Sequence, residues 1–127
     1  VPSFETAKKI NKELGRVGNL KSDGQPILGL DSEYLMKIVL EADSRAAVVP
    51  AHAWTPWFSV FGSMSGFNSL DECFGDYAKY IFAIETGLSS DPLMNRRVSM
   101  LDNIALISNS DSHSLQRIGR EANVLEC

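Results

Sequence analysis

The amino-acid sequence predicts an α/β fold, as a contiguous section of a larger α/β barrel with mainly parallel strands. Three short apolar runs, at residues 46–49, 80–84 and 104–107, are typical of buried strands. Helical patterns alternate with these runs, as they do in parallel sheets and barrels. Because three strands are too few to close a barrel, we expect only part of one.

The N-terminal segment is predicted to form a helix followed by a polar loop. Ser3 is a good N-cap for a helix over residues 4–14, which then ends at a glycine. Residues 18–29 form the loop, where Gly24 and Pro26 favour turns.

Further helices are expected from their N-cap signals. Asp31 precedes a helix with an apolar face, and Ser69 opens a capping box for a short helix. Asp91 followed by proline predicts a helix over residues 92–97, and residues 114–118 are expected to form a last turn capped by serine. The apolar face of the helix after Asp31 consists of Leu35, Ile38, Val39 and Ala42.

Composition and charge narrow the class of protein. The chain has 127 residues, 44% of them hydrophobic, which is enough for a core. Twelve Lys and Arg against sixteen Asp and Glu give a net charge of −4, which excludes a polybasic, histone-like binder. No apolar run approaches the roughly 20 residues of a membrane span, and no signal peptide is visible.

The ends and the cysteines of the chain carry two further expectations. Two cysteines without a C-x-x-C pair predict no disulfide framework and a reducing, cytoplasmic setting. The chain does not begin with Met, so we expect either a processed protein or a piece of a longer one.

Chemically useful side chains follow each predicted strand. His52 follows the first, Glu85 ends the second, and Asp111 and His113 follow the third. Because the carboxyl ends of parallel strands meet at one edge, these groups should converge there. Imidazole and carboxylate suit Zn²⁺, Mn²⁺ or Fe²⁺, and such ions activate water. Alternatively, Glu85 anchors the following turn by accepting backbone N–H groups.

An aromatic loop follows His52. Residues 46–70 contain no Asp, Glu, Lys or Arg, yet they hold five of the eleven aromatic residues. Trp54 and Trp57 are the best candidates for stacking on a nucleobase, whereas packing of the loop onto the core is the alternative. Four arginines are candidates for phosphate contacts or for solvated helix faces: Arg96, Arg97, Arg117 and Arg120.

Several strings in the sequence resemble the PHP (polymerase and histidinol phosphatase) superfamily, and more narrowly its endonuclease Q branch. They are Pro50-Ala51-His52, Ile84-Glu85-Thr86-Gly87-Leu88-Ser89-Ser90-Asp91-Pro92, Ser108-Asn109-Ser110-Asp111-Ser112-His113 and Gly119-Arg120-Glu121-Ala122-Asn123. The stretches at 52–59 and 19–24 are similar to that branch as well. The likeness runs through nearly the whole chain.

The resemblance implies a metal-dependent hydrolase on a distorted α/β barrel, with zinc, manganese or magnesium ions at the strand ends. It implies an endonuclease of DNA repair that cuts DNA beside deaminated bases or abasic sites. Carried over residue by residue, His52, Asp111 and His113 match metal ligands. Glu85 matches a position near the site and is our candidate catalytic residue. Our candidates for DNA contacts are Trp54, Trp57, Arg97 and Arg120.

The chain departs from the family by lacking an early His-x-His pair and a cysteine-bearing zinc module. We therefore expect residues 1–127 to be a single partial catalytic domain, without the N-terminal section and C-terminal modules. Alone, it should bind metal weakly, have little or no nuclease activity, and tend to self-associate through exposed edges. A PHP-type phosphatase acting on a small phosphate ester, and a non-catalytic binding or scaffold section, are the alternatives.

Overall fold

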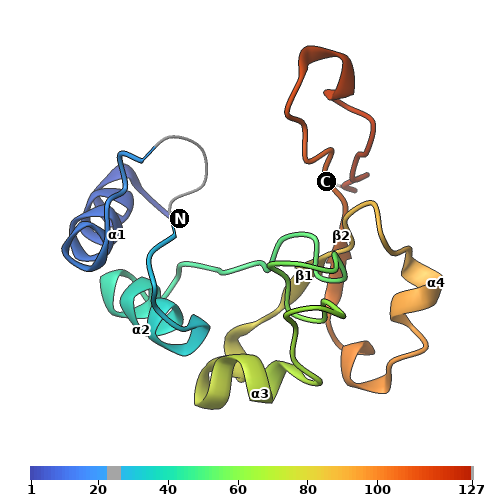
Figure 1. Cartoon of the computed structure of the whole chain (residues 1–127), viewed down its shortest axis with the longest axis horizontal. Helices are drawn as coiled ribbons and strands as arrows, with labels where there is room; N and C mark the ends of the chain where they lie inside the picture. Colours follow the sequence, from blue (N-terminus) through green and yellow to red (C-terminus); the bar gives the residue numbers. More distant parts are fainter. Residues whose placement is uncertain (23–26, 127) are drawn as a thin grey trace.

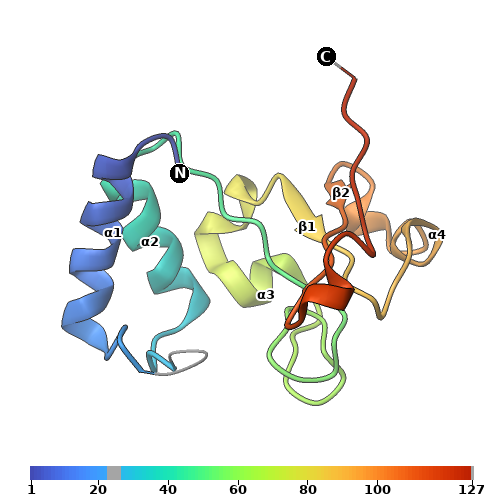
Figure 2. The same ribbon diagram turned by 90° about the horizontal axis from the view of Figure 1, so that it is seen from above.

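A computed structural model of the chain describes residues 1–22 and 27–126, so Gly24 and Pro26 lie outside the described residues. Two N-terminal helices pack side by side, and a small sheet with short helices lies next to them (Figures 1 and 2). The last segment, after the sheet, extends away from the rest of the fold (Figure 1). None of the described helices has the length and apolar character needed to cross a membrane.

The helices α1 (Phe4–Val17) and α2 (Ser32–Ala42) form a helical hairpin with its own small core of Ile10, Val39 and Ala46. Ser3 caps α1 and Asp31 caps α2, as predicted. α1 runs beyond the expected end at Leu14, because a glycine inside a helix costs only about 1 kcal/mol relative to alanine. The helix ends at the C-cap Gly18, whose N–H donates to the carbonyl of Leu14.

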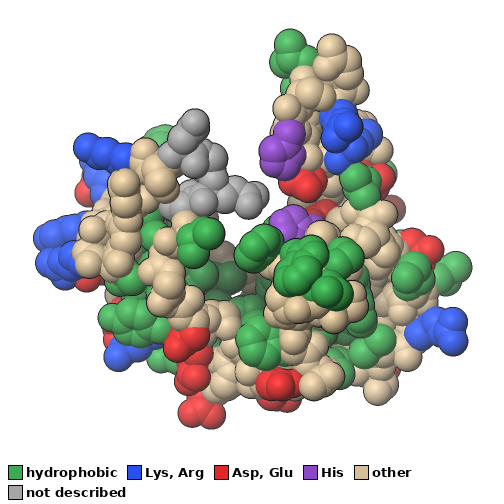
Figure 3. Space-filling view, viewed as in Figure 1, with side chains coloured by type: hydrophobic (Ala, Val, Ile, Leu, Met, Phe, Trp, Pro, Cys, Tyr) green, Lys and Arg blue, Asp and Glu red, His purple; other side chains and the backbone are tan. Residues whose placement is uncertain are grey.

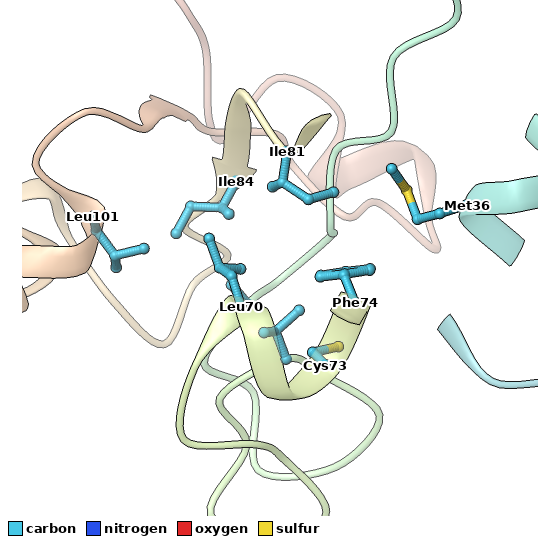
Figure 4. Packing of buried hydrophobic residues seen from close by; sticks show 9 residues of the cluster. Met36, Leu70, Cys73, Phe74, Ile81, Ile84 and Leu101 are labelled. Atoms are coloured by element: carbon cyan, nitrogen blue, oxygen red, sulfur yellow. The ribbon is translucent and has the colours of Figure 1, made fainter. Parts of the chain in front are cut away.

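The main core lies between α2, the sheet and the segment α3 (Leu70–Phe74), which continues as the 3₁₀ helix η1 (Gly75–Tyr80). Ser69 caps α3, as predicted. Side chains from three directions meet there (Figure 4). The most deeply buried are Met36, Ala53, Ile81, Ile84 and Leu101.

The barrel section predicted from the sequence is wrong. The described part of the chain is mostly helix and loop, with a single sheet of two short parallel strands. These are β1 (Ala83–Glu85) and β2 (Ala105–Ile107), in register at Ile84 and Leu106. A pair of three-residue strands lacks the length and number to close on itself.

The predicted strands at residues 46–49 and 80–84 are also corrected. Residues 46–49 form no strand, because the backbone bonds to β1 come later in the chain, where the Pro50 carbonyl accepts from the Glu85 N–H and the Ala53 N–H donates to the Glu85 carbonyl. A single pair of bonds does not make a ladder. The second strand begins only at Ala83, because the preceding residues up to Tyr80 coil into η1.

The remaining elements are short. α4 (Pro92–Asn95) starts at the predicted cap Asp91 but ends before Arg97. The 3₁₀ turns η2 (Ser99–Leu101) and η3 (Leu115–Arg117) follow. The predicted last turn exists as η3, but the Ser114 side chain makes no cap bond to it.

Candidate functional site

Three of the four side chains expected at the strand ends line one cavity of about 170 Å³ beyond the carboxyl ends of β1 and β2. They are His52, Glu85 and Asp111. The other lining residues are Val49, Ala51, Ile107 and Asn109. The loop after residue 50 reaches the cavity because its backbone is bonded to both sides of Glu85.

Glu85 is buried, with 4% of its surface exposed. One carboxylate oxygen accepts the His52 N–H at 2.5 Å, and the other accepts the N–H groups of Gly87 at 3.0 Å and Asn109 at 3.1 Å. A buried carboxylate needs such donors because it has lost its water. The side chain thus anchors backbone, which is the alternative role that the sequence allowed for it.

His52 presents an unsatisfied nitrogen. Its Nδ1 is buried and has no hydrogen-bond partner among the described residues. Its backbone is left-handed, with φ of 35°, which is uncommon for a residue with a side chain. A Cβ on Gly87 would lie 3.0 Å from the His52 Cα, so glycine is required for this close approach.

Asp111 also has a left-handed backbone, with φ of 43°, and about half of its side chain is exposed. The His113 ring lies beside it, with Nδ1 at 3.0 Å from the Asp111 carbonyl oxygen and 3.9 Å from the carboxylate Oδ1. His113 is 70% exposed and does not line the cavity. Histidine and acidic side chains lie near one another on this face of the molecule (Figure 3).

The donor set fits part of a metal site. His52, which has an unpartnered imidazole nitrogen, and Asp111 line the same cavity, and imidazole and carboxylate are both ligand types that divalent metals take. Across residues 1–22 and 27–126, however, no three His, Cys, Asp or Glu side chains form a group that could hold an ion. Further ligands, or movement of His113, are needed to complete a coordination shell.

The two tryptophans of the aromatic loop differ in exposure. The Trp54 ring packs against Phe61 with centroids 4.7 Å apart, and its Nε1 donates to the side chain of the fully buried Asn95 at 2.8 Å. Trp54 therefore belongs to the packed interior, which was the alternative for this loop. Trp57 is 53% exposed, so its ring is accessible to a stacking partner.

The arginines also differ in exposure and in their hydrogen bonds. The Arg96 guanidinium donates to the carbonyls of Leu101, Asp102 and Ile104, which fixes it within the fold. Arg97 is exposed. Arg120 is exposed as well, but its Nε donates to the Ser110 carbonyl at 2.7 Å, next to Asp111. Neither Arg97 nor Arg120 lines the cavity.

The sequence did not indicate how the C-terminal segment is attached. Glu121 accepts the Ser108 hydroxyl at 2.8 Å, and the Asn123 side chain bonds both the N–H and the carbonyl of Ser108. Both residues lie in one of the strings that carry the resemblance, which was the available signal. Their contacts span 13 and 15 residues, so no local pattern specifies them.

Comparisons with known proteins give two curated relatives. The uncharacterized protein YqxK of Bacillus subtilis (strain 168) is 42% identical over 126 residues, which cover 98% of this chain and 31% of the relative. The uncharacterized protein MJ0043 of Methanocaldococcus jannaschii is 31% identical over 129 residues, which cover 93% of this chain and 16% of the relative. No family model and no solved structure matches. The chain therefore spans less than a third of the length of either relative.

Proposed function

We propose that this chain is a section of a metal-dependent phosphodiesterase that hydrolyses DNA next to deaminated bases or abasic sites. In this proposal His52 and Asp111, joined by His113, supply part of the ligand set for zinc, manganese or magnesium. The protein acts in the cytoplasm, and its DNA partner is bound through the complete, longer protein.

One observation carries the proposal: His52, whose buried Nδ1 has no hydrogen-bond partner among the described residues, lines the same cavity as Asp111. Burying an imidazole nitrogen without a hydrogen-bond partner destabilises the folded state, unless a bound ligand supplies the missing partner. The two residues are 59 positions apart, so their meeting is a property of the tertiary structure.

The bound metal would supply a water molecule acidic enough to act as a nucleophile at neutral pH. The chain's own residues would hold the metal and orient the DNA. His52 would offer an imidazole nitrogen and Asp111 a carboxylate, and the apolar residues Val49 and Ile107 also line the cavity. Exposed Trp57 offers a ring surface for an unstacked base.

The test uses a relative of full length, because the described residues provide too few ligands for a strong site. Nicking of DNA that contains uracil, hypoxanthine or an abasic site is measured with Mn²⁺ or Zn²⁺, beside hydrolysis of a generic phosphomonoester. Alanine then replaces the residues aligned with His52, Asp111 and His113. Alanine at the position aligned with exposed Lys79 is the control.

Nicking that disappears with any of the three substitutions and persists in the control supports the proposal. Hydrolysis of the phosphomonoester alone would identify a phosphatase instead. Metal content and activity that survive all three substitutions would leave a binding or scaffold role. For the 127-residue chain alone we expect a zinc dissociation constant above the submicromolar range and no robust nicking.

A further inference from the structure

We propose that Glu85 is a positioning residue, whose buried carboxylate sets the distance and orientation between the loops that carry His52 and Asp111. The inference rests on the proposed function for its metal readout. It differs from a ligand role, because the carboxylate acts through backbone N–H groups and not through an ion.

The hydrogen bonds of Glu85 reach all three loops at the cavity. Oε2 takes the N–H of His52 itself, and Oε1 takes the N–H of Asn109, two residues before Asp111. Oε1 also takes the N–H of Gly87, which fixes the turn after β1. A single side chain therefore links segments that are separated by 33 and 24 residues along the chain.

The burial of Glu85 makes these bonds strong determinants of loop position. The residue is 4% exposed, so water does not compete for its oxygens. Bonds from backbone N–H groups to a carboxylate are shorter and stronger than neutral ones, and a buried carboxylate without them is costly. Each loop is therefore held against the same fixed group.

The backbone at the two candidate ligands needs such support. His52 and Asp111 both occupy left-handed conformations, with φ of 35° and 43°. Such conformations are strained for residues with side chains and persist only where neighbouring structure enforces them. The N–H of His52 is bonded directly to Glu85, and the Asn109 bond lies just before the turn at Asp111.

The variant Glu85→Gln tests the hydrogen bonds of Glu85 at nearly unchanged side-chain size. Glu85→Gln keeps the size of the side chain but replaces one acceptor oxygen with an NH₂ group. That group faces an N–H donor, so it must release either His52 or the Gly87 and Asn109 pair. Asp43→Asn is the matched control, because it removes a multiply bonded carboxylate at the α1–α2 hairpin, away from the cavity.

The readout is NMR of the imidazole groups during titration with Zn²⁺. The chain has two histidines, so a spectrum of His113→Gln assigns the signals of His52. In Glu85→Gln we expect the His52 signals to move before zinc is added, and the zinc dissociation constant to rise about tenfold or more. In Asp43→Asn both should match the wild type, although the fold is weaker. A Glu85→Gln chain with unchanged His52 signals and zinc affinity would overturn the proposal.

Amide exchange in the wild-type chain provides a test that needs no variant. The N–H groups of His52, Gly87 and Asn109 should exchange with solvent as slowly as those of β1. If they exchange as fast as the exposed amides around residue 120, the carboxylate does not hold the loops and the positioning role fails. If the amides are protected but the full-length relative binds no zinc, the metal function fails while the positioning role stands.

Discussion

Asn123 pairs with the backbone of Ser108 in both directions. Its side-chain oxygen accepts the Ser108 N–H at 2.8 Å, and its side-chain nitrogen donates to the Ser108 carbonyl at 2.7 Å. The amide thus occupies the place of a neighbouring strand at the end of β2, and it returns the C-terminal segment to the sheet. The loop between them carries Asp111 and His113.

Replacing this amide should loosen the loop without unfolding the core. Asn123→Ala removes two exposed hydrogen bonds, so we expect a loss of about 1–2 kcal/mol in the free energy of unfolding at most. Faster amide exchange at Ser108 and easier proteolysis between residues 109 and 122 are the expected local effects. Asn109→Ala, whose side chain is not used in this pairing, is the control. Unchanged exchange at Ser108 in the first variant contradicts this role.

Asn95 organises the contact between the aromatic loop and α4. Fully buried, it accepts from Trp54 and donates to the Ser90 hydroxyl and the Asp91 carbonyl. Asn95→Ala should lower the free energy of unfolding by on the order of 3 kcal/mol, because unpaired buried groups cost about 1–3 kcal/mol each. Urea unfolding measures the loss.

A double-mutant cycle checks whether Trp54 and Asn95 act as a pair. Trp54→Phe keeps an aromatic ring and removes the Nε1 donor. If the two substitutions together cost clearly less than the sum of the single losses, the pair is coupled. Strict additivity is the result that excludes the bond as a stabilising contact.

Local signals in the sequence predicted local structure well. Ser3, Asp31, Ser69 and Asp91 were expected as N-caps, and each accepts the N–H three residues later. This prediction is confirmed. It was possible because the bond of an N-cap residue depends only on the first turn of its own helix. The strand at 46–49 was wrong because an apolar run specifies burial, whereas a strand also needs a partner along its whole length.

The candidate site was also predicted only in part, because its details depend on tertiary structure. The carboxyl-end rule led to the residues that line the cavity, since His52, Glu85 and Asp111 do meet there. It did not indicate that His113 would lie outside, nor that the Glu85 oxygens would be occupied by N–H groups from three loops. These details depend on loop conformations, including two left-handed residues, that composition does not specify.

Asp43 should make the stability of the helical hairpin depend on pH. The side-chain hydrogen bonds of Arg45 hold the pKa of Asp43 well below its ordinary value of 3.8, and bonds from the Arg45 backbone and Thr6 add to this. Because the folded pKa is lower, the unfolded chain takes up the proton first. The contribution is therefore fully present above about pH 4 and is lost as the pH falls towards the folded pKa.

Urea unfolding followed by circular dichroism at pH 7 and pH 3 tests this. The wild type should lose more stability on acidification than Asp43→Asn, which has no group to titrate there. Thr6→Val is the control: it removes one hydroxyl bond but leaves Arg45, so most of the pH dependence should remain. Equal acid sensitivity in the wild type and Asp43→Asn would disprove the assignment.

The exposed surface predicts self-association of the isolated chain. It exposes 8882 Å², whereas a folded monomer of 14.0 kDa exposes about 6,700 Å². Large apolar side chains such as Ile27, Phe58 and Phe82 contribute to the excess. Sedimentation velocity should show dimers or larger species that increase with concentration and decrease when Phe58 is replaced by Ser. A monomer over the whole micromolar range contradicts the prediction.

The proposed function predicts that the two tryptophans respond differently to single-stranded DNA. Trp57→Ala is expected to weaken binding by about 1–3 kcal/mol, the range for one stacked base, with no change in stability, because its ring is 53% exposed. Trp54→Phe should leave affinity unchanged and lower stability, because Trp54 is bonded to Asn95 in the interior. Fluorescence titration with an oligonucleotide reports each ring when the other is absent. Quenching confined to Trp54, or affinity unaffected by loss of Trp57, would show that the base does not stack on this loop.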